Sequence, residues 1–171
     1  PRLAALGHVR SVAELISALA GHPFGRALAD AWDRGGRQGR HPFYLEVALD
    51  LVHERGLVER IDGLAGADRK DAIALLGRAL ALENLIAAGR YRASSGVSPE
   101  EVVNFCLHRD FGGGLAMVQR VAAGGSLRDE AAALGISVGE AGDDPAILLA
   151  VERALDREQR AAARARFGRQ P

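Results

Sequence analysis

The spacing of apolar residues along this chain predicts helices almost throughout. Between residues 42 and 62 the apolar positions recur at intervals of three and four, which places them on one helix face. They are Leu45, Ala48, Leu49 and Val52. A longer pattern of this kind covers 68–93, and shorter ones cover 99–108 and 114–123. Strand-like alternation is nearly absent, so we expect an all-α fold of antiparallel helices.

Polar residues at regular distances mark where several of these helices begin. Ser11 with Glu14, and Ser98 with Glu101, have the spacing of a capping box. In that motif each side chain bonds a backbone N–H that the first helical turn leaves free. Ser126, three residues before an aspartate, is predicted to begin a short helix in the same way.

Prolines and glycines predict the remaining helix limits. Pro23 suits the first turn of a helix that ends near Trp32 and forms a short pair with the helix before it. Residues 33–41 contain three glycines and are predicted to be a flexible linker. Pro145 begins the last helix, which is expected to end near Phe167.

One short pattern occurs twice. Glu46 and Asp50 enclose an Ala-Leu pair, and Glu152 and Asp156 enclose another such pair 106 residues later. Self-similarity of this kind indicates a structural unit that is used more than once. Coincidence in an alanine-rich chain is the alternative.

The repeat predicts repeated antiparallel helical bundles of unequal completeness. Residues 1–123 would form one nearly complete bundle, and 124–171 would begin a second, homologous copy that is truncated. The last helix carries an apolar stripe that this partial copy has no helices to cover. The stripe consists of Ile147, Val151, Ala154 and Leu155. We therefore expect the stripe to be bare, or to be covered by another molecule.

Composition narrows the classes of function. The formal net charge is zero, so no overall field attracts nucleic acid. Cys106 is the single cysteine, which excludes a disulfide or a cysteine-cluster metal site within these residues. No uncharged stretch reaches the roughly 18 residues that a membrane span needs, so we expect no direct span.

A few polar positions in the long helices are candidates for a specific role. Glu46 and Asp50 lie one helical turn apart and could act as an acid pair, but such pairs are more often a solvated face or an interhelical salt bridge. Asn84, in mid-helix, is either exposed or buried and hydrogen-bonded at a helix crossing. Arg90 is predicted to pair across helices with Glu46 or Asp50.

Three further features are weaker candidates. Cys106 and His108 lack other ligands at metal-binding spacing. The glycines of 111–114 precede a helix, as in a phosphate cradle, but no Walker-type lysine motif accompanies them and a helix–helix turn is preferred. The arginine-rich end of the last helix suggests nucleic acid or lipid headgroups, and we prefer a solvated face. No catalytic residue, cofactor or metal is assigned.

The order of these motifs resembles one protein family. A short helix pair over 15–28 precedes the first Glu-x-Ala-Leu-Asp, and the densest match follows at 83–92. After it come the helix start at Ser98 and the second Glu-x-Ala-Leu-Asp. In this order they resemble the C-subunit family of prokaryotic V/A-type ATPases, whose eukaryotic V-type members are called d-subunits. The positions that carry the resemblance are Glu46, Asp50, Asn84, Leu85, Arg90, Arg92, Glu152 and Asp156.

The resemblance implies a structural role. That family consists of three related helical bundles, of which this chain would cover about half. Its members lie on the cytoplasmic side of the membrane between the central shaft and the membrane rotor ring, where they transmit torque without chemistry. Ala81 stands where the family often has an acid, and Glu83 adjoins Asn84 instead. The alternative is a free-standing all-α protein-interaction module.

Overall fold

The computed structural model describes residues 6–38, 41–109, 114–140 and 142–167. Every regular element within these ranges is a helix, which confirms the predicted all-α fold class. In chain order the helices are α2 (Val12–Ala18), α3 (Pro23–Gln38), α4 (His41–Asp62), α5 (Gly66–Ala93), α6 (Pro99–Asn104), α7 (Gly114–Ala122), α8 (Leu127–Ala133) and α9 (Asp144–Phe167).

Serine caps begin the helices where the sequence predicts them. The Ser98 hydroxyl accepts the N–H of Glu101 at 3.2 Å, and the Glu101 carboxylate accepts the N–H of Ser98 at 3.0 Å, which completes a capping box. The Ser11 hydroxyl likewise accepts the N–H of Glu14. The Glu14 carboxylate accepts the backbone N–H of Arg10 at 2.8 Å, whereas a capping box would use the N–H of Ser11.

The predicted flexible linker at 33–41 is wrong over its first part. Helix α3 continues to Gln38, and α4 begins at His41, while residues 39–40 lie outside the described ranges. A buried stripe explains the continuation, because every third or fourth residue of α3 faces the interior. These positions are Leu28, Ala31 and Gly35. Packing of this stripe outweighs the cost of about 1 kcal/mol that each glycine adds to a helix.

Helix α6 ends at Asn104, short of the predicted limit at 108. Phe105 is its C-cap and donates its N–H to the carbonyl of Glu101. The physical reason for the early end is Leu107, whose backbone N–H and C=O both bond to a side chain of α5. A continued helix would have used these groups internally.

The chain divides into two compact units, Pro1–Val58 and Glu59–Pro171. In the first unit, α2 packs against α3. This division differs from the predicted boundary after residue 123. Helix α7 precedes that boundary and α8 and α9 follow it, yet all three pack on α5 within the second unit.

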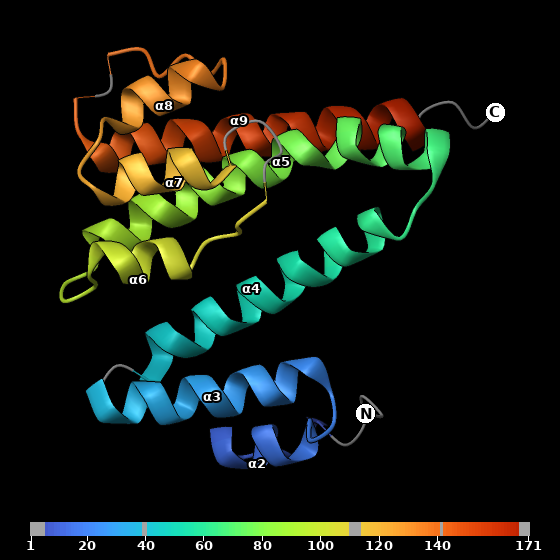
Figure 1. Ribbon diagram of the computed structural model, residues 1–171, viewed down its shortest axis with the longest axis vertical. Helices are drawn as coiled ribbons and strands as arrows, with labels where there is room; N and C mark the ends of the chain where they lie inside the picture. The colour runs from blue at the N-terminus through green and yellow to red at the C-terminus, as the bar shows by residue number, and fades with distance from the viewer. Residues whose placement is uncertain (1–5, 39–40, 110–113, 141, 168–171) are drawn as a thin grey trace. The chain divides into compact units, whose positions relative to one another are not determined.

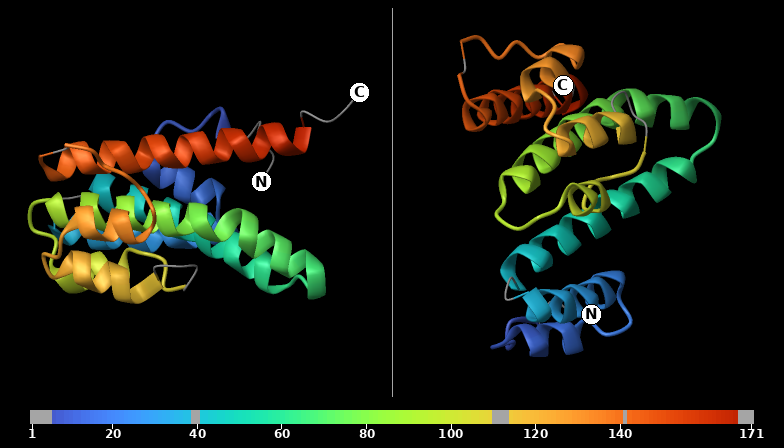
Figure 2. Two further views of the ribbon diagram at one scale, coloured as in Figure 1. Left: turned by 90° about the horizontal axis from the view of Figure 1, so that it is seen from above. Right: turned by 60° about the vertical axis from the view of Figure 1, so that its left-hand side comes forward.

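Helix α5 is the centre of the second unit and contacts α6, α7, α8 and α9 (Figure 1). The turned views show the same neighbours around it (Figure 2). Gly89 permits close packing here, because a Cβ at this position would lie 2.7 Å from Cδ2 of Leu148 and 3.2 Å from both δ carbons of Leu127. The largest fully buried side chains of this core are Leu82, Leu85, Met117, Leu127, Val102, Val118, Val121 and Val151.

The apolar stripe of α9 is covered within its own unit, so the prediction of a bare stripe is wrong. Its buried members lie against α5 and α8. They are Ile147, Val151 and Ala154, each at most 6% exposed, while Leu155 is partly buried against the same core and Leu148 is buried beside them. The sequence could not show this cover, because α5 lies on the far side of the predicted boundary.

Helix α5 is also the described helix that is long and apolar enough to cross a membrane by length and composition. Half of its most apolar window is buried inside the protein. The core helix of a helical bundle has the same properties, and α5 occupies that position in the second unit.

Candidate functional site

The polar residues of α5 that carry the family resemblance all bind other parts of the second unit. Asn84 is 3% exposed. Its Nδ2 donates to the carbonyl of Leu107, and its Oδ1 accepts the N–H of Leu107, both at 2.8 Å. The prediction that Asn84 is buried and hydrogen-bonded is therefore confirmed, but its partner lies in the segment after α6 and not in a crossing helix. Leu85, beside it, is fully buried in the core.

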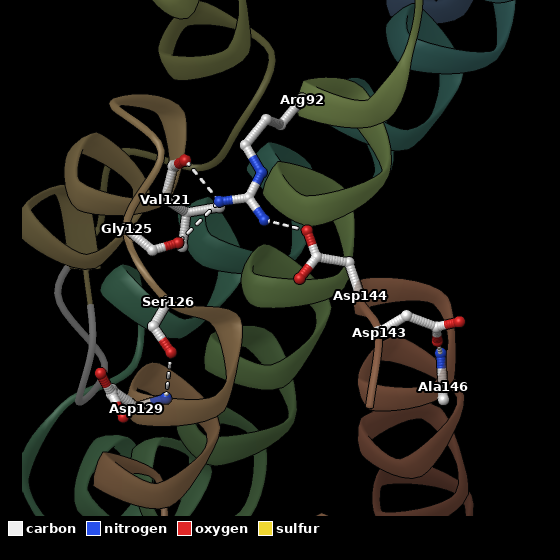
Figure 3. Close-up of polar contacts among 8 residues, drawn as sticks. All are labelled: Arg92, Val121, Gly125, Ser126, Asp129, Asp143, Asp144 and Ala146. Carbon is white, nitrogen blue, oxygen red and sulfur yellow. Dashed lines mark hydrogen bonds and ion pairs between the residues drawn. The ribbon is translucent and has the colours of Figure 1, made fainter. Parts of the chain in front are cut away.

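Arg92 joins the end of α7 to the start of α9 (Figure 3). Its Nη1 donates to the carbonyls of Val121, at 3.1 Å, and Gly125, at 2.6 Å. Its Nη2 forms an ion pair with the carboxylate of Asp144. The guanidinium charge lies at the carbonyl end of α7 and the Asp144 charge at the N-terminus of α9, and both placements are favoured by the helix dipoles.

The turn after α7 presents these carbonyls to Arg92. Gly124 has a φ of +92°, and its N–H donates to Val121, while the N–H of Gly125 donates to Arg120 at 2.8 Å. This is a Schellman ending, which needs a residue with positive φ. The hydroxyl of Ser126 then accepts the N–H of Asp129 at 3.2 Å and begins α8, so a single short turn connects the two helices (Figure 3).

Arg90 pairs with Glu152 at 2.6 Å, a partner in its own unit, whereas the sequence predicted Glu46 or Asp50. The reason is that α9 packs against α5 and brings Glu152 to it. Arg90 thus meets the second copy of the repeated acid instead of the first. A second tie between these helices joins Arg78 to Glu158 at 2.8 Å.

The other repeated acids have different surroundings. Glu46 and Asp50 are both exposed on α4. Asp156 is exposed on α9 and accepts from Nε of Arg160 at 2.8 Å. That hydrogen bond lowers the pKa of the Asp156 carboxyl. The two copies therefore share an exposed aspartate but differ at the glutamate, which is exposed at Glu46 and paired with Arg90 at Glu152.

Three further ion pairs have no counterpart in the sequence analysis. Arg120 binds Glu130 with two hydrogen bonds, at 2.5 and 2.8 Å, and ties α7 to α8 across the glycine turn. Asp62 accepts from Arg69 at 2.9 Å and from Arg109 at 2.6 Å. The Asp62 contacts join residues separated by 7 and 47 positions. No helical spacing signals the longer one.

The contacts described above are hydrogen bonds and ion pairs that connect helices and segments of the second unit. No cluster of three metal-ligating side chains occurs in the part of the chain that the structure describes. Cys106 is buried, and Nε2 of His108 lies 2.6 Å from the carbonyl of Val103. The glycine segment considered as a phosphate cradle falls at 111–113, outside the described residues, and Gly114 begins α7.

No protein-family model, curated protein or solved structure matches this chain.

Proposed function

We propose that this chain is a non-catalytic coupling component of a rotary V/A-type ATPase. In this role it connects the central shaft to the membrane rotor ring, on the cytoplasmic side of the membrane, and transmits torque. Its partners are the shaft proteins and the ring, with no nucleic acid, cofactor or substrate. The ordered resemblance to the C-subunit family supports the proposal, as do the contacts of the motif residues.

One observation carries the proposal: the motif residues of α5 act as ties between helices. Asn84 holds the segment after α6, Arg92 holds α7 and α9, and Arg90 holds α9 a second time. A long helix tied in this way to the segment after α6, to α7 and to α9 resists bending and sliding. Torque transmission requires such stiff packing and no reactive side chain.

The proposal includes the bundle repeat. Glu46 with Asp50 and Glu152 with Asp156 would mark equivalent helices of related bundles, in α4 and α9. Both copies lie in long helices, and each helix begins close to a proline. The missing acid at Ala81 removes one contact of the family, and Asn84 supplies a buried polar tie one helical turn further on.

The second candidate is a free-standing all-α protein-interaction module outside any ATPase. The covered stripe of α9 favours it, because the second unit has a core of its own without a partner protein. The two candidates differ in what they bind. A coupling component binds the shaft and the ring, and a free-standing module binds neither.

Reconstitution with purified components tests the proposal. The chain is mixed with the shaft proteins and rotor ring of a V/A-type ATPase at micromolar concentrations and moderate salt, and complexes are separated by size-exclusion chromatography. Association with the shaft and the ring is expected, without ATP hydrolysis by the chain alone. Failure to bind either component rejects the rotary role.

A second measurement addresses torque. In vesicles with an ATPase that lacks its own coupling component, Arg92→Met should lower ion transport per ATP hydrolysed, because it loosens α7 and α9 on α5. Arg10→Met, an exposed change outside the helices, is the control and should leave this ratio unchanged. Equal ratios for both variants would contradict a coupling role of these ties.

A further inference from the structure

The solvent side of α9 carries a line of arginines, which we call the arginine line: Arg153, Arg157, Arg160 and Arg164. All four are exposed. Intervals of four, three and four keep them on one helix face, over a length of about 16 Å at the rise of an α-helix. The line lies opposite the buried stripe, because Val151 and Arg160 are separated by about two and a half turns.

Most of this charge forms no ion pair inside the described part of the chain, although Arg157 acts electrostatically on the Asp156 carboxyl. Arg160 is bound by Asp156, whereas no carboxylate there forms an ion pair with Arg153, Arg157 or Arg164. The remaining carboxylates of α9 all pair with arginines of α5. Every acid of α9 except Asp156 therefore pairs with α5, and positive charge accumulates on the solvent side.

We propose that the arginine line is a docking surface for an acidic helix of a partner protein. Leu149 is 45% exposed and lies four residues before Arg153, so it extends the line with an apolar contact. A partner helix with one leucine and several glutamates at the same intervals would cover Leu149 and pair with each arginine. Arginine forms two-pronged bonds with carboxylates and is enriched at protein interfaces.

The other anionic partners fit less well. The zero net charge gives no long-range attraction to a nucleic acid. A helix that binds a lipid surface inserts its apolar face, but Ile147 and Val151 of α9 are already buried in the protein. The inference does not depend on the rotary assignment, since it follows from α9 alone.

A synthetic peptide probes the surface directly. It is a capped helical peptide rich in alanine, in which one leucine and four glutamates repeat the intervals from Leu149 to Arg164. A scrambled peptide of equal composition spreads the glutamates around the helix. Fluorescence polarisation at moderate salt measures both. We expect the patterned peptide to bind the whole chain more tightly than the scrambled one.

Two matched triple variants locate the binding. The first neutralises the unpaired members of the line: Arg153→Gln, Arg157→Gln and Arg164→Gln. The second neutralises three exposed arginines of the first unit: Arg10→Gln, Arg26→Gln and Arg55→Gln. We expect the first to bind the patterned peptide roughly tenfold more weakly, and the second to bind as the wild type does. Circular dichroism verifies that both retain their helices.

Several outcomes overturn the proposal. They are no binding of the patterned peptide to the wild type, equal binding of the scrambled peptide, and an equal effect of the two triple variants. If oligo-dT or phosphatidylserine vesicles bind through the arginine line while the peptide does not, the surface belongs to a nucleic acid or a membrane, and the proposed partner is wrong.

Discussion

The side-chain amide of Asn84 satisfies both backbone groups of a single residue, Leu107, which is 23 positions away. The segment after α6 has no helix of its own at that point, so the amide replaces the hydrogen bonds that a continued helix would supply. All of these groups are buried, where an unpaired donor or acceptor is costly.

The first prediction concerns this contact. Asn84→Ala leaves the N–H and the C=O of Leu107 unpaired, and it should lower the free energy of unfolding by about 3 kcal/mol. Asn104→Ala removes an exposed asparagine of α6 and should change the free energy of unfolding by less than about 0.5 kcal/mol. Urea unfolding followed by circular dichroism measures both. Equal values would show that the amide contact contributes nothing.

The second prediction distinguishes the two partners considered for Arg90. Charge reversal of Arg90 and Glu152, singly and together, should show a coupling of about 0.5 kcal/mol in a double-mutant cycle, because both side chains are partly exposed. The same cycle with Arg90→Glu and Glu46→Arg should be additive. Coupling in the second cycle and none in the first would contradict the observed pairing.

The third prediction is a dependence on pH. The hydrogen bond from Arg69, aided by Arg109, lowers the pKa of Asp62 from its ordinary value of 3.8. Because the folded value is below the unfolded one, the contribution to stability is complete well above 3.8 and is lost as the pH falls through the lowered value. The wild type should therefore lose stability in acid more steeply than Asp62→Asn does.

A companion variant controls for the removed carboxylate. Arg69→Gln with Arg109→Gln keeps Asp62 but removes its donors, and its acid dependence should match that of Asp62→Asn. Thermal unfolding between pH 7 and pH 3 supplies the comparison. If the wild type and both variants lose stability in parallel, these arginines do not shift the titration of Asp62.

The fourth prediction uses two helical glycines of the first unit. A Cβ at Gly25 would lie 2.1 Å from the carbonyl oxygen of Leu19, which is rigid backbone, so Gly25→Ala should cost about 2 kcal/mol. A Cβ at Gly56 meets nothing within 4 Å, so Gly56→Ala should add about 0.5–1 kcal/mol. Fluorescence of Trp32, the single tryptophan, follows unfolding of this unit. Changes of equal sign would reject this account.

Local sequence signals made the helix starts predictable, whereas features that depend on contacts distant in the sequence were not predictable. The hydroxyls of Ser98 and Ser126 each accept the N–H of the residue three positions later, so the spacing of these caps is visible in the sequence. The continuation of α3 beyond Trp32 depends on the burial of Gly35. The composition of segment 33–41, taken alone, indicates a linker instead. Tertiary packing determines the structure of a segment wherever its free energy exceeds that of the local helix or turn propensity.

The site was predictable in its residues but only partly in its contacts. Asn84 stood out because an asparagine in mid-helix needs a reason. The partner of Arg90 depends on which helix packs against α5, and spacing along the chain does not contain that information. Arg92 was indicated by the resemblance alone, and two of its three acceptors are backbone carbonyls that no side-chain pattern displays.

The carbonyl acceptors of Arg92 have an evolutionary consequence. Every residue has a backbone carbonyl, whatever its side chain. Val121 can therefore be exchanged for another apolar residue without loss of the hydrogen bond from Arg92. The same holds for Leu107 opposite Asn84. In an alignment of related sequences, the arginine and the asparagine would stay constant while their partners drift. Analysis of correlated substitutions detects contacts through paired changes. It would therefore miss the contacts of Asn84 with Leu107 and of Arg92 with Val121.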